Sequence, residues 1–293
     1  MKINAKNIFL VVISLTTMYS FSKGQTPVGG GIYSNTTWSL ANSPYIVTDT
    51  VVVFPGVTLT IEPGVTVKFE DNQRLEIRQA HLISVGTVTD SITFTSNSST
   101  PTPGIWSGIF LNECPNPIEF NYCNFKYAYV AIDKQAYDND ILVIKNSNFN
   151  FNYSGISNLT YAISGTTIDS CNFENNTYGI GRIIRGFDAI IKNSNFINNQ
   201  TGIRAAQGIP IENCVYISNQ IGIFRTGGLG YIKNCLIDSN STAGIILSHT
   251  GDDEIINCQI KHNGIGIYDS LAYSGNKIRM NIIENNTIGT IVS

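Results

Sequence analysis

An internal repeat of 20–24 residues constrains this chain more than any other feature. A small residue marks each copy, at Cys123, Ser147, Cys171, Ser194, Cys214, Cys235, Cys258 and Asn281. Other columns keep fixed offsets from it: an Ile or Phe three places earlier, an aromatic residue or Ile two places later, and an Asn five places later in every copy but the first. Self-similarity at such a period indicates a solenoid in which each copy forms one coil.

The repeat has the periodicity of β-strands. Within each copy, apolar residues alternate with polar ones over short runs, and they are β-branched or aromatic. The stripes that helical repeat arrays require are absent. A coil of this length holds two or three short strands, and successive coils stack about 4.8 Å apart, as neighbouring strands do. We therefore predict an all-β parallel β-helix in which each column becomes a ladder of like residues, and we expect the Asn column to form a left-handed corner.

The first residues have the pattern of an export signal. Lys2 and Lys6 precede the apolar run 8–13, and small and polar residues follow. This arrangement is typical of a signal peptide, and the apolar run is shorter than the roughly 20 residues of a membrane span. Residues 1–24 are therefore predicted to be a signal peptide, which makes the mature protein secreted, extracellular or attached at the cell surface, with no membrane span.

Three further segments follow from the pattern. Residues 25–44, around Trp38, are expected to cap the first coil, because an open coil end is a sticky edge. Residues 45–112 alternate with period two but repeat irregularly, and we predict N-terminal coils there. Residues 113–293 contain the regular repeats, so that the whole solenoid is predicted to have about 11–12 coils.

Specific segments resemble a known family. These are Pro44-Tyr-Ile-Val47, Gly56-Val-Thr-Leu-Thr-Ile-Glu-Pro-Gly64, Ile105-Trp-Ser-Gly-Ile109 and the later Asn-Cys-x-Ile/Phe-x-x-Asn copies. Together they resemble secreted bacterial right-handed parallel β-helix repeat proteins with the pectin-lyase-like fold, over about residues 40–292. The resemblance implies a single-stranded right-handed helix. It does not select an activity, because the fold is shared by lyases, hydrolases, epimerases and adhesins.

Composition and cysteine placement exclude several classes of partner and site. Charged residues make up 13% of the chain and the net charge is −3, which leaves no basic surface for nucleic acid. The chain has no Cys-x-x-Cys pair and its three histidines are scattered, which disfavours zinc. Five of the six cysteines lie in the repeat column, where Ser147 and Ser194 also occur. We therefore expect stacked buried thiols, with disulfides between coils as the alternative.

Acidic residues cluster in two variable loops. One loop contains Asp133, Asp138 and Asp140, and the other contains Asp252, Asp253 and Glu254. Oxygen-rich loops can hold Ca²⁺, so these aspartates are weak calcium candidates, with solvated loop acids as the alternative. No other cofactor is expected.

A candidate ligand-binding face follows the Gly-Ile pair that most copies carry eight and nine places after the repeat marker, in a segment expected to be a strand. Arginines stand one or two residues after this strand in three consecutive copies, and we expect them to project outward. Aromatic residues and an acid at matching places in other copies suit a sugar surface, and an ordinary solvent-facing sheet is the alternative. The candidate face consists of Arg182, Arg204, Phe224, Arg225, Tyr268 and Asp269.

No catalytic residues can be assigned from the sequence. Gly251-Asp252-Asp253 and Lys277-Ile278-Arg279 resemble two of the four motifs of polygalacturonase-like hydrolases, but the Asn-Thr-Asp and Gly-His-Gly motifs are missing. The sequence therefore favours a secreted, non-catalytic carbohydrate-binding or structural, adhesive module whose partner is a polysaccharide or cell-surface glycan. The alternative is a lyase or glycoside hydrolase that acts on an acidic polysaccharide.

Overall fold

The computed structural model describes residues 24–114, 117–134, 141–157, 166–183, 189–205, 208–270 and 275–292, with only the backbone given for 182 and 183. Residues 1–23 of the predicted signal peptide lie outside this range. The described residues form β-strands and one short 3₁₀ helix, η1 (Leu40–Asn42). Within them, no helix is long and apolar enough to cross a membrane.

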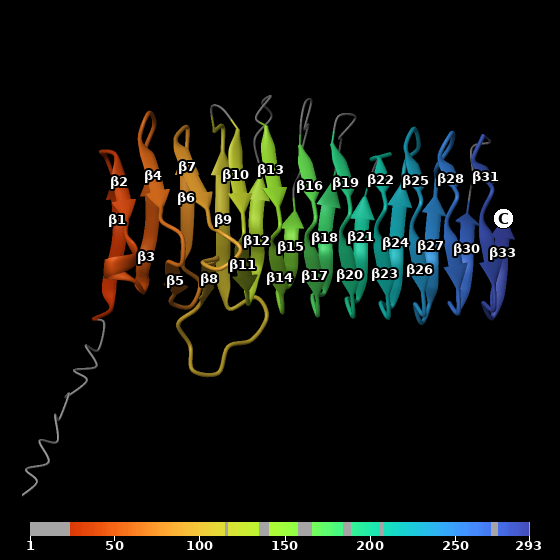
Figure 1. The fold of residues 1–293 in the computed structure, drawn as a ribbon, viewed down its shortest axis with the longest axis horizontal. Helices are drawn as coiled ribbons and strands as arrows, with labels where there is room; N and C mark the ends of the chain where they lie inside the picture. Colours follow the sequence, from red (N-terminus) through yellow and green to blue (C-terminus); the bar gives the residue numbers. More distant parts are fainter. Residues whose placement is uncertain are drawn as a thin grey trace, which may run out of the picture.

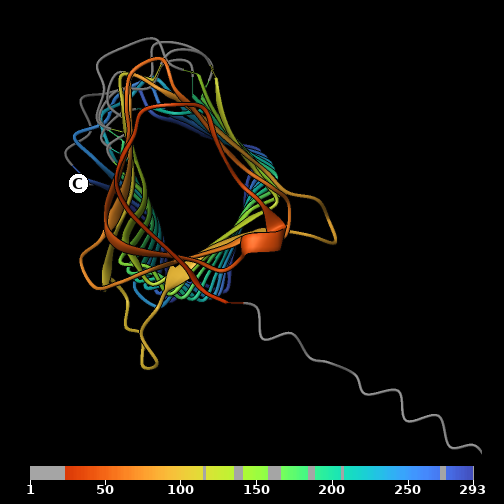
Figure 2. The same cartoon turned by 90° about the vertical axis from the view of Figure 1, so that its left-hand side faces the viewer.

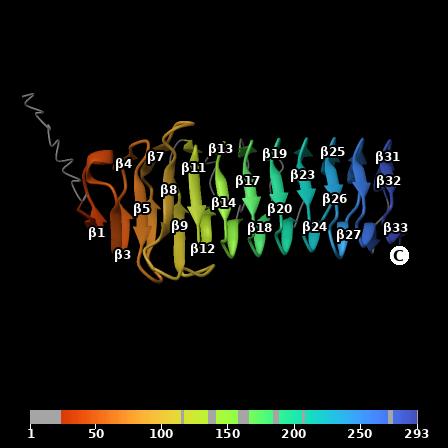
Figure 3. The same ribbon diagram turned by 60° about the horizontal axis from the view of Figure 1, so that its bottom comes forward.

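The described strands form two parallel sheets of 22 and 11 strands that wind around one axis. Figure 1 shows the coils side by side along this axis, and Figure 2 shows, from one end, that the strands of successive coils superpose around a closed cross-section. We call the 11-stranded sheet wall A. The 22-stranded sheet bends at a corner into two further walls, B and C, and Figure 3 shows their strands recurring in the same order.

Each wall takes one strand from each coil. Wall A consists of β2 (Thr36–Trp38), β4 (Thr58–Ile61), β7 (His81–Val85), β10 (Ile118–Asn121), β13 (Leu142–Lys145), β16 (Thr167–Asp169), β19 (Ile190–Lys192), β22 (Ile211–Glu212), β25 (Tyr231–Lys233), β28 (Glu254–Ile256) and β31 (Lys277–Arg279). Wall B consists of β5 (Thr66–Phe69), β8 (Ile92–Ser96), β11 (Cys123–Lys126), β14 (Asn148–Asn150), β17 (Asn172–Glu174), β20 (Asn195–Ile197), β23 (Val215–Ile217), β26 (Leu236–Asp238), β29 (Gln259–Lys261) and β32 (Ile282–Glu284).

Wall C completes each coil. It consists of β6 (Arg74–Arg78), β9 (Trp106–Asn112), β12 (Ala128–Lys134), β15 (Ser154–Ser157), β18 (Tyr178–Ile183), β21 (Thr201–Ala205), β24 (Ile221–Thr226), β27 (Ala243–Ser248), β30 (Ile265–Ser270) and β33 (Ile288–Val292). In the first coils, β1 (Thr26–Ile32) pairs with β3 (Tyr45–Val53), which pairs in turn with strands of both walls B and C.

The predicted all-β solenoid is confirmed. Walls B and C each have ten described strands, and wall A has one more at the N-terminal end. The solenoid therefore has about ten complete coils, slightly fewer than the 11–12 expected. The segment 25–44 contributes β1 and β2 to the two sheets, and the buried Trp38 stacks on Tyr45 with ring centroids 5.0 Å apart.

The interior is built from stacked columns, as the repeat predicted. Phe149, Phe173, Phe196 and Tyr216 lie one over another, with ring centroids 4.6–4.8 Å apart and planes within 7° of parallel. All four rings are fully buried. Burial of such a side chain stabilises the fold by about 1.5–3 kcal/mol, and each ring pair adds about 0.5–1.5 kcal/mol. The aromatic column is therefore a large part of the core.

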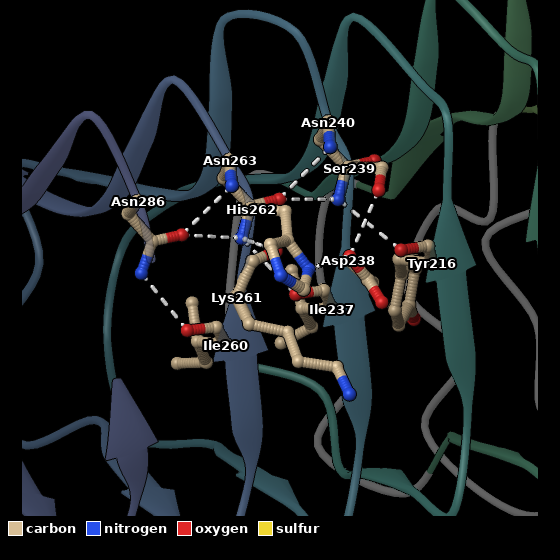
Figure 4. Close-up of polar contacts among 10 residues, drawn as sticks. All are labelled: Tyr216, Ile237, Asp238, Ser239, Asn240, Ile260, Lys261, His262, Asn263 and Asn286. Atoms are coloured by element: carbon tan, nitrogen blue, oxygen red, sulfur yellow. Dashed lines mark hydrogen bonds and ion pairs between the residues drawn. The ribbon is translucent and has the colours of Figure 1, made fainter. Parts of the chain in front are cut away.

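The Asn column forms a buried hydrogen-bond ladder between walls B and C (Figure 4). The backbone N–H and the Nδ2 of Asn240 both donate to Asn263 Oδ1, at 2.9 and 2.8 Å, and Asn240 Nδ2 also donates to the Tyr216 carbonyl at 3.1 Å. The same set of bonds recurs from Asn152 to Asn286. Each amide thus satisfies a backbone N–H and a carbonyl of the preceding coil, which would otherwise be buried without partners.

The expected position of the left-handed corner was wrong by one residue. Positive φ occurs at the residue before each ladder Asn, for example at Asn175, Ser218 and His262, and not at the ladder residue itself. The physical reason is that the ladder Asn must point its amide inward. The exposed residue before it therefore takes the left-handed conformation that the corner requires.

The cysteines are buried thiols, as expected. All six are free and buried. Burial raises the pKa of Cys123 and of Cys171 to about 12, and both thiols contact main-chain carbonyls. They act as small core residues that Ser replaces in other coils.

The ladder can be tested with Asn199→Ala. This change leaves the Asn176 backbone N–H and side-chain amide without their acceptor, so we expect a loss of at least about 2 kcal/mol in the free energy of unfolding, measured by urea titration. Asn195→Ala is the matched control, because Asn195 belongs to an exposed amide ladder, and we expect a change of at most about 0.5 kcal/mol. Equal effects of the two changes would contradict this role for the buried ladder.

Candidate ligand-binding face

Three of the sequence candidates lie in one outward column of wall C. Strand register places Arg204 beside Phe224, Phe224 beside Ile246, and Ile246 beside Tyr268. Arg204 is exposed and the other three are half-buried. The strands alternate inward and outward side chains, and the buried isoleucine before each of these residues fixes which way it points. Successive coils therefore line up a cation, two aromatic rings and one aliphatic side chain.

A shallow pocket opens at one end of this column. It has a volume of about 190 Å³ and is lined by Tyr178, Thr201, Arg204, Ile221 and Phe224. We call these five residues the Arg204 pocket. Tyr178, Thr201 and Ile221 are neighbours in a second column of wall C, so the pocket lies between two adjacent columns over three coils.

Tyr178 is the aromatic pocket residue that the sequence analysis missed, together with Thr201 and Ile221. Tyr129 and Tyr153, on the two preceding coils, stack with centroids 4.8 Å apart and planes 4° from parallel. Strand register places Tyr178 beside Ser154, in the neighbouring column, and its ring meets the Tyr153 ring at 80° and 5.7 Å. Tyr178 therefore does not extend this parallel stack, and its ring contributes to the pocket. Neighbouring coils carry Thr201 and Ile221 at this place, so no repeated residue type marked the column.

Arg182 belongs to β18, but its side chain lies outside the described residues. A register irregularity between Ile180 and Ile183 separates it from the regular pairing with β21. Arg182 therefore stays a sequence-based candidate.

The expectation that Arg225 projects outward was wrong. Its side chain is 0% exposed, and its Nη1 donates to Asp253 Oδ1 at 2.9 Å while its Nη2 donates to the Ile209 carbonyl at 2.6 Å. The reason is a difference of one residue. Arg204 stands ten places after its repeat marker and Arg225 stands eleven, and successive side chains of a strand point to opposite faces.

Asp269 is also buried, for the same reason. It occupies the place in β30 that Arg225 occupies in β24, and Asn276 Nδ2 donates to both of its carboxylate oxygens, at 3.2 and 3.1 Å. The Asn276 Oδ1 accepts the backbone N–H of Asp253. These residues form an internal polar cluster and do not contribute to the outer face.

The calcium candidates that the structure describes are not brought together into a metal site. Asp252 is exposed, Asp253 is paired with Arg225, and Glu254 accepts bonds from Lys277 and Arg279. Burial raises the pKa of Asp253, and the Arg225 guanidinium opposes this rise. Asp138 and Asp140 lie outside the described residues, while Asp133 is half-buried in β12. Among the residues that the structure describes, no group of three or more acidic, His or Cys side chains is arranged to hold a metal ion.

The outer face of wall A carries a second polar constellation that the sequence analysis did not select. Tyr231 Oη donates to Glu212 Oε1 at 2.7 Å. This hydrogen bond, together with partial burial and the carboxylate charge, raises the pKa of Tyr231 to about 12. Further along the wall, the Lys277 and Arg279 pair with Glu254 at 3.3 and 3.0 Å. Lys277 and Arg279, which resemble a hydrolase motif in the sequence, are thus held by an acidic partner.

Comparison with known proteins agrees with this architecture. A family model described as a right handed beta helix region matches residues 183–293, and one described as a pectate-lyase like beta helix domain matches residues 30–116. The described coils form a parallel β-solenoid of the right-handed type. This architecture is consistent with the pectin-lyase-like fold, as the resemblance in the sequence implied.

A solved structure, that of AlgG, has a similar fold. A mutant of the periplasmic alginate epimerase AlgG superposes with a TM-score of 0.50 at 10% identity, covering 87% of this chain and 76% of that one. The A-module of the Azotobacter vinelandii mannuronan C-5 epimerase AlgE6 aligns over 93% of this chain and 91% of that one, with a TM-score of 0.28 and 12% identity. At such identities the likeness concerns the fold alone.

A curated relative extends the comparison in sequence. Protein bark beetle of Drosophila melanogaster is 36% identical over 112 residues. The match covers 36% of this chain but 4% of that protein, so the matched residues span a small part of that protein's length.

The buried ion pair can be tested with Arg225→Met. The change leaves the Asp253 carboxylate buried without its cation, and we expect a loss of about 3–5 kcal/mol in the free energy of unfolding, measured by urea titration. A second change, Asp253→Asn, should restore much of this loss, because the amide oxygen can still accept the Gly230 N–H. Arg204→Met is the control and should change stability by at most about 0.5 kcal/mol. A small effect of Arg225→Met would contradict the buried pair.

The Tyr231–Glu212 contact can be tested by alkaline titration. The difference between the absorbance titrations of the wild type and Tyr231→Phe isolates one tyrosine, and we expect its midpoint near pH 12. Glu212→Gln removes the carboxylate charge and should return the midpoint toward the ordinary value of about 10. A wild-type midpoint already at the ordinary value would show that the hydrogen bond does not form in solution.

Proposed function

We propose that this protein is a secreted glycan-binding solenoid that binds acidic polysaccharide at the Arg204 pocket without turning it over. The observation that carries the proposal is that the exposed Arg204 guanidinium and the rings of Tyr178 and Phe224 line one shallow pocket of the outer face. Binding sites for small ligands combine apolar walls with a few placed polar groups, and this pocket has that composition.

Arg204 supplies the group that recognises an acid. In the described part of the chain, no carboxylate lies within ion-pair distance of its guanidinium, in contrast to the paired arginines Arg225 and Arg279. A guanidinium forms two parallel hydrogen bonds with a carboxylate, which gives both direction and strength. The ring carbons of a uronate sugar carry C–H groups that can pack on Tyr178 and Phe224. The pocket thus suits a pyranose with an acidic substituent.

Binding without turnover is favoured by what lines the pocket. Apart from Arg204, Tyr178 is the titratable side chain among the described lining residues, and no described Asp, Glu, His or Lys contributes to the lining. Hydrolysis requires two carboxylates, and elimination from a uronate requires a base within reach of the sugar proton. Arg204 can orient an acid, but this lining supplies no proton acceptor matched to neutral pH.

A lyase or hydrolase remains the second candidate, and the wall A constellation is the observation that favours it. Tyr231 with Glu212 offers a proton-transfer pair, and Lys233 lies beside Glu212 in the strand register. However, a pKa of about 12 keeps Tyr231 protonated at neutral pH, which makes it a poor base. The binding role is therefore better supported.

The cellular place of the protein is part of the proposal. We propose that residues 1–24 direct export and are removed, so that the solenoid works outside the cell or at its surface, where acidic polysaccharides occur. Mass spectrometry of the protein from the medium of an expressing bacterium would check the cleavage between residues 22 and 25.

The binding role can be tested by affinity electrophoresis in gels that contain polygalacturonate or alginate. We expect retardation of the wild type and at least about tenfold weaker binding of Arg204→Ala, because a charge-assisted bidentate contact contributes about 1.5–3 kcal/mol. Lys233→Ala is the matched control, since it removes one positive charge from wall A and should leave retardation unchanged.

Two results would overturn the proposal. Equal retardation of Arg204→Ala and the wild type would remove the pocket from the binding surface. Absorbance of unsaturated uronate products, or new reducing ends, on incubation with the same polymers would show turnover and establish the enzymatic alternative.

A further inference from the structure

A second cationic cluster lies on wall C, in the irregular coils near the N-terminus. Arg74, Glu76 and Arg78 alternate along β6 with the buried Leu75 and Ile77, so all three point outward. Arg74 Nη2 donates to Glu76 Oε2 at 3.0 Å, and Arg78 Nε donates to Glu76 Oε1 at 2.7 Å. We call Arg74, Glu76 and Arg78 the arginine clamp.

Each guanidinium of the clamp is held by two contacts, one with the Glu76 carboxylate and one with an aromatic ring. The guanidinium of Arg74 lies over the Phe110 ring at 5.4 Å, and that of Arg78 lies over the Phe54 ring at 5.5 Å. Glu76 is 3% exposed although it points outward, because the two arginines cover it. Their own side chains stay 45% and 41% exposed. A guanidinium fixed between a carboxylate and a ring loses little further freedom when it binds a ligand.

The charge of the clamp is not balanced. Two guanidinium groups share one carboxylate, which leaves one net positive charge at the surface. In the described residues, Arg74 Nε, Arg74 Nη1 and Arg78 Nη1 have no hydrogen-bond acceptor. These donors face solvent and can bind an anionic group such as a carboxylate or a sulfate.

Strand register places the clamp in line with Arg204. Glu76 pairs with Phe110, Phe110 with Asp133, and Asp133 with Ser157. Glu76 directly follows the buried Leu75, and each of the other three directly follows a buried isoleucine. Arg204 follows the buried Ile203 in the continuation of this column across β18 and β21. Five strand spacings separate β6 from β21, which corresponds to about 24 Å along the axis.

We propose that the arginine clamp is a second anion-binding station on wall C, and that one acidic polysaccharide chain lies along the solenoid axis and contacts both the clamp and the Arg204 pocket. The spanning chain rests on the proposed function, whereas anion binding by the clamp rests on its own geometry. The clamp and the Arg204 pocket are fixed on one rigid scaffold, so once a chain is bound at one of these two stations, its contact with the other is intramolecular. A long chain therefore binds more tightly than either station alone allows.

The test compares a short and a long ligand by isothermal titration calorimetry. The short ligand is a galacturonate trisaccharide, which cannot span about 24 Å, and the long ligand is a polygalacturonate chain that can. The variant Arg74→Gln, Glu76→Gln, Arg78→Gln removes the clamp without leaving a buried unpaired carboxylate, and it lowers the net charge by one unit. Lys233→Gln is the control with the same charge change on wall A. Thermal unfolding of each variant checks that the fold is kept.

We expect the clamp variant to bind the long chain at least about tenfold more weakly than the wild type, and to bind the trisaccharide as the wild type does. Arg204→Ala should weaken both ligands. Unchanged binding of the long chain by the clamp variant would overturn the spanning chain and leave the Arg204 pocket standing.

Further comparisons distinguish the remaining explanations of the binding data. If Arg204→Ala and the clamp variant both bind the long chain as the wild type does, both the spanning chain and the proposed function fail. Dextran sulfate in place of polygalacturonate distinguishes sulfate from carboxylate recognition by the clamp. Duplex DNA of matched charge that binds equally, with equal loss in the clamp variant, would show unspecific polyanion binding and overturn the assignment to glycans.

Discussion

In-register pairing between consecutive coils is the constraint on which the rest of the molecule depends. Each strand binds the strand one coil earlier and one coil later, so every inward position becomes a column. A slip by one residue would turn all inward side chains of that strand to the outside, which the buried aromatic and Asn columns prevent. The ladder amides connect this register to the corner, because each one bonds to the backbone of the preceding coil. Packing and hydrogen bonding therefore select the same register.

The fold was predictable because the inward columns repeat the same residue types, while the site was only partly predictable because the outward columns do not. Arg204, Phe224 and Tyr268 were found since each directly follows a repeated isoleucine. Arg225 was misplaced since a shift of one residue leaves the sequence pattern nearly unchanged and reverses the side-chain direction. Tyr178 carried no signal, because its neighbours in the strand register, Ser154, Thr201 and Ile221, do not repeat its residue type.

The same physics indicates where a solenoid can bind a ligand. A uniform outward ladder, such as the linked amides of Asn148, Asn172 and Asn195, uses its donors and acceptors between coils and leaves few for other molecules. A column whose residues change from coil to coil cannot satisfy itself in this way. The column from Arg204 to Tyr268 is of this mixed kind, and Tyr178, Thr201 and Ile221 form a second mixed column beside it. Mixed columns are thus the places to search for function in this fold.

The small negative net charge of −3 does not oppose the binding of an acidic polymer. Exposed charges are screened beyond about 8–10 Å at physiological ionic strength, so a bound chain responds to the groups directly beneath it. The acids near the cations of this protein are largely engaged: Asp253 holds the buried Arg225, and Glu254 holds Lys277 and Arg279. Arg204 is left without such a partner among the described residues, and the clamp has one cation more than it has carboxylates. Local imbalance on wall C, and not the total charge, decides which face an anionic chain contacts.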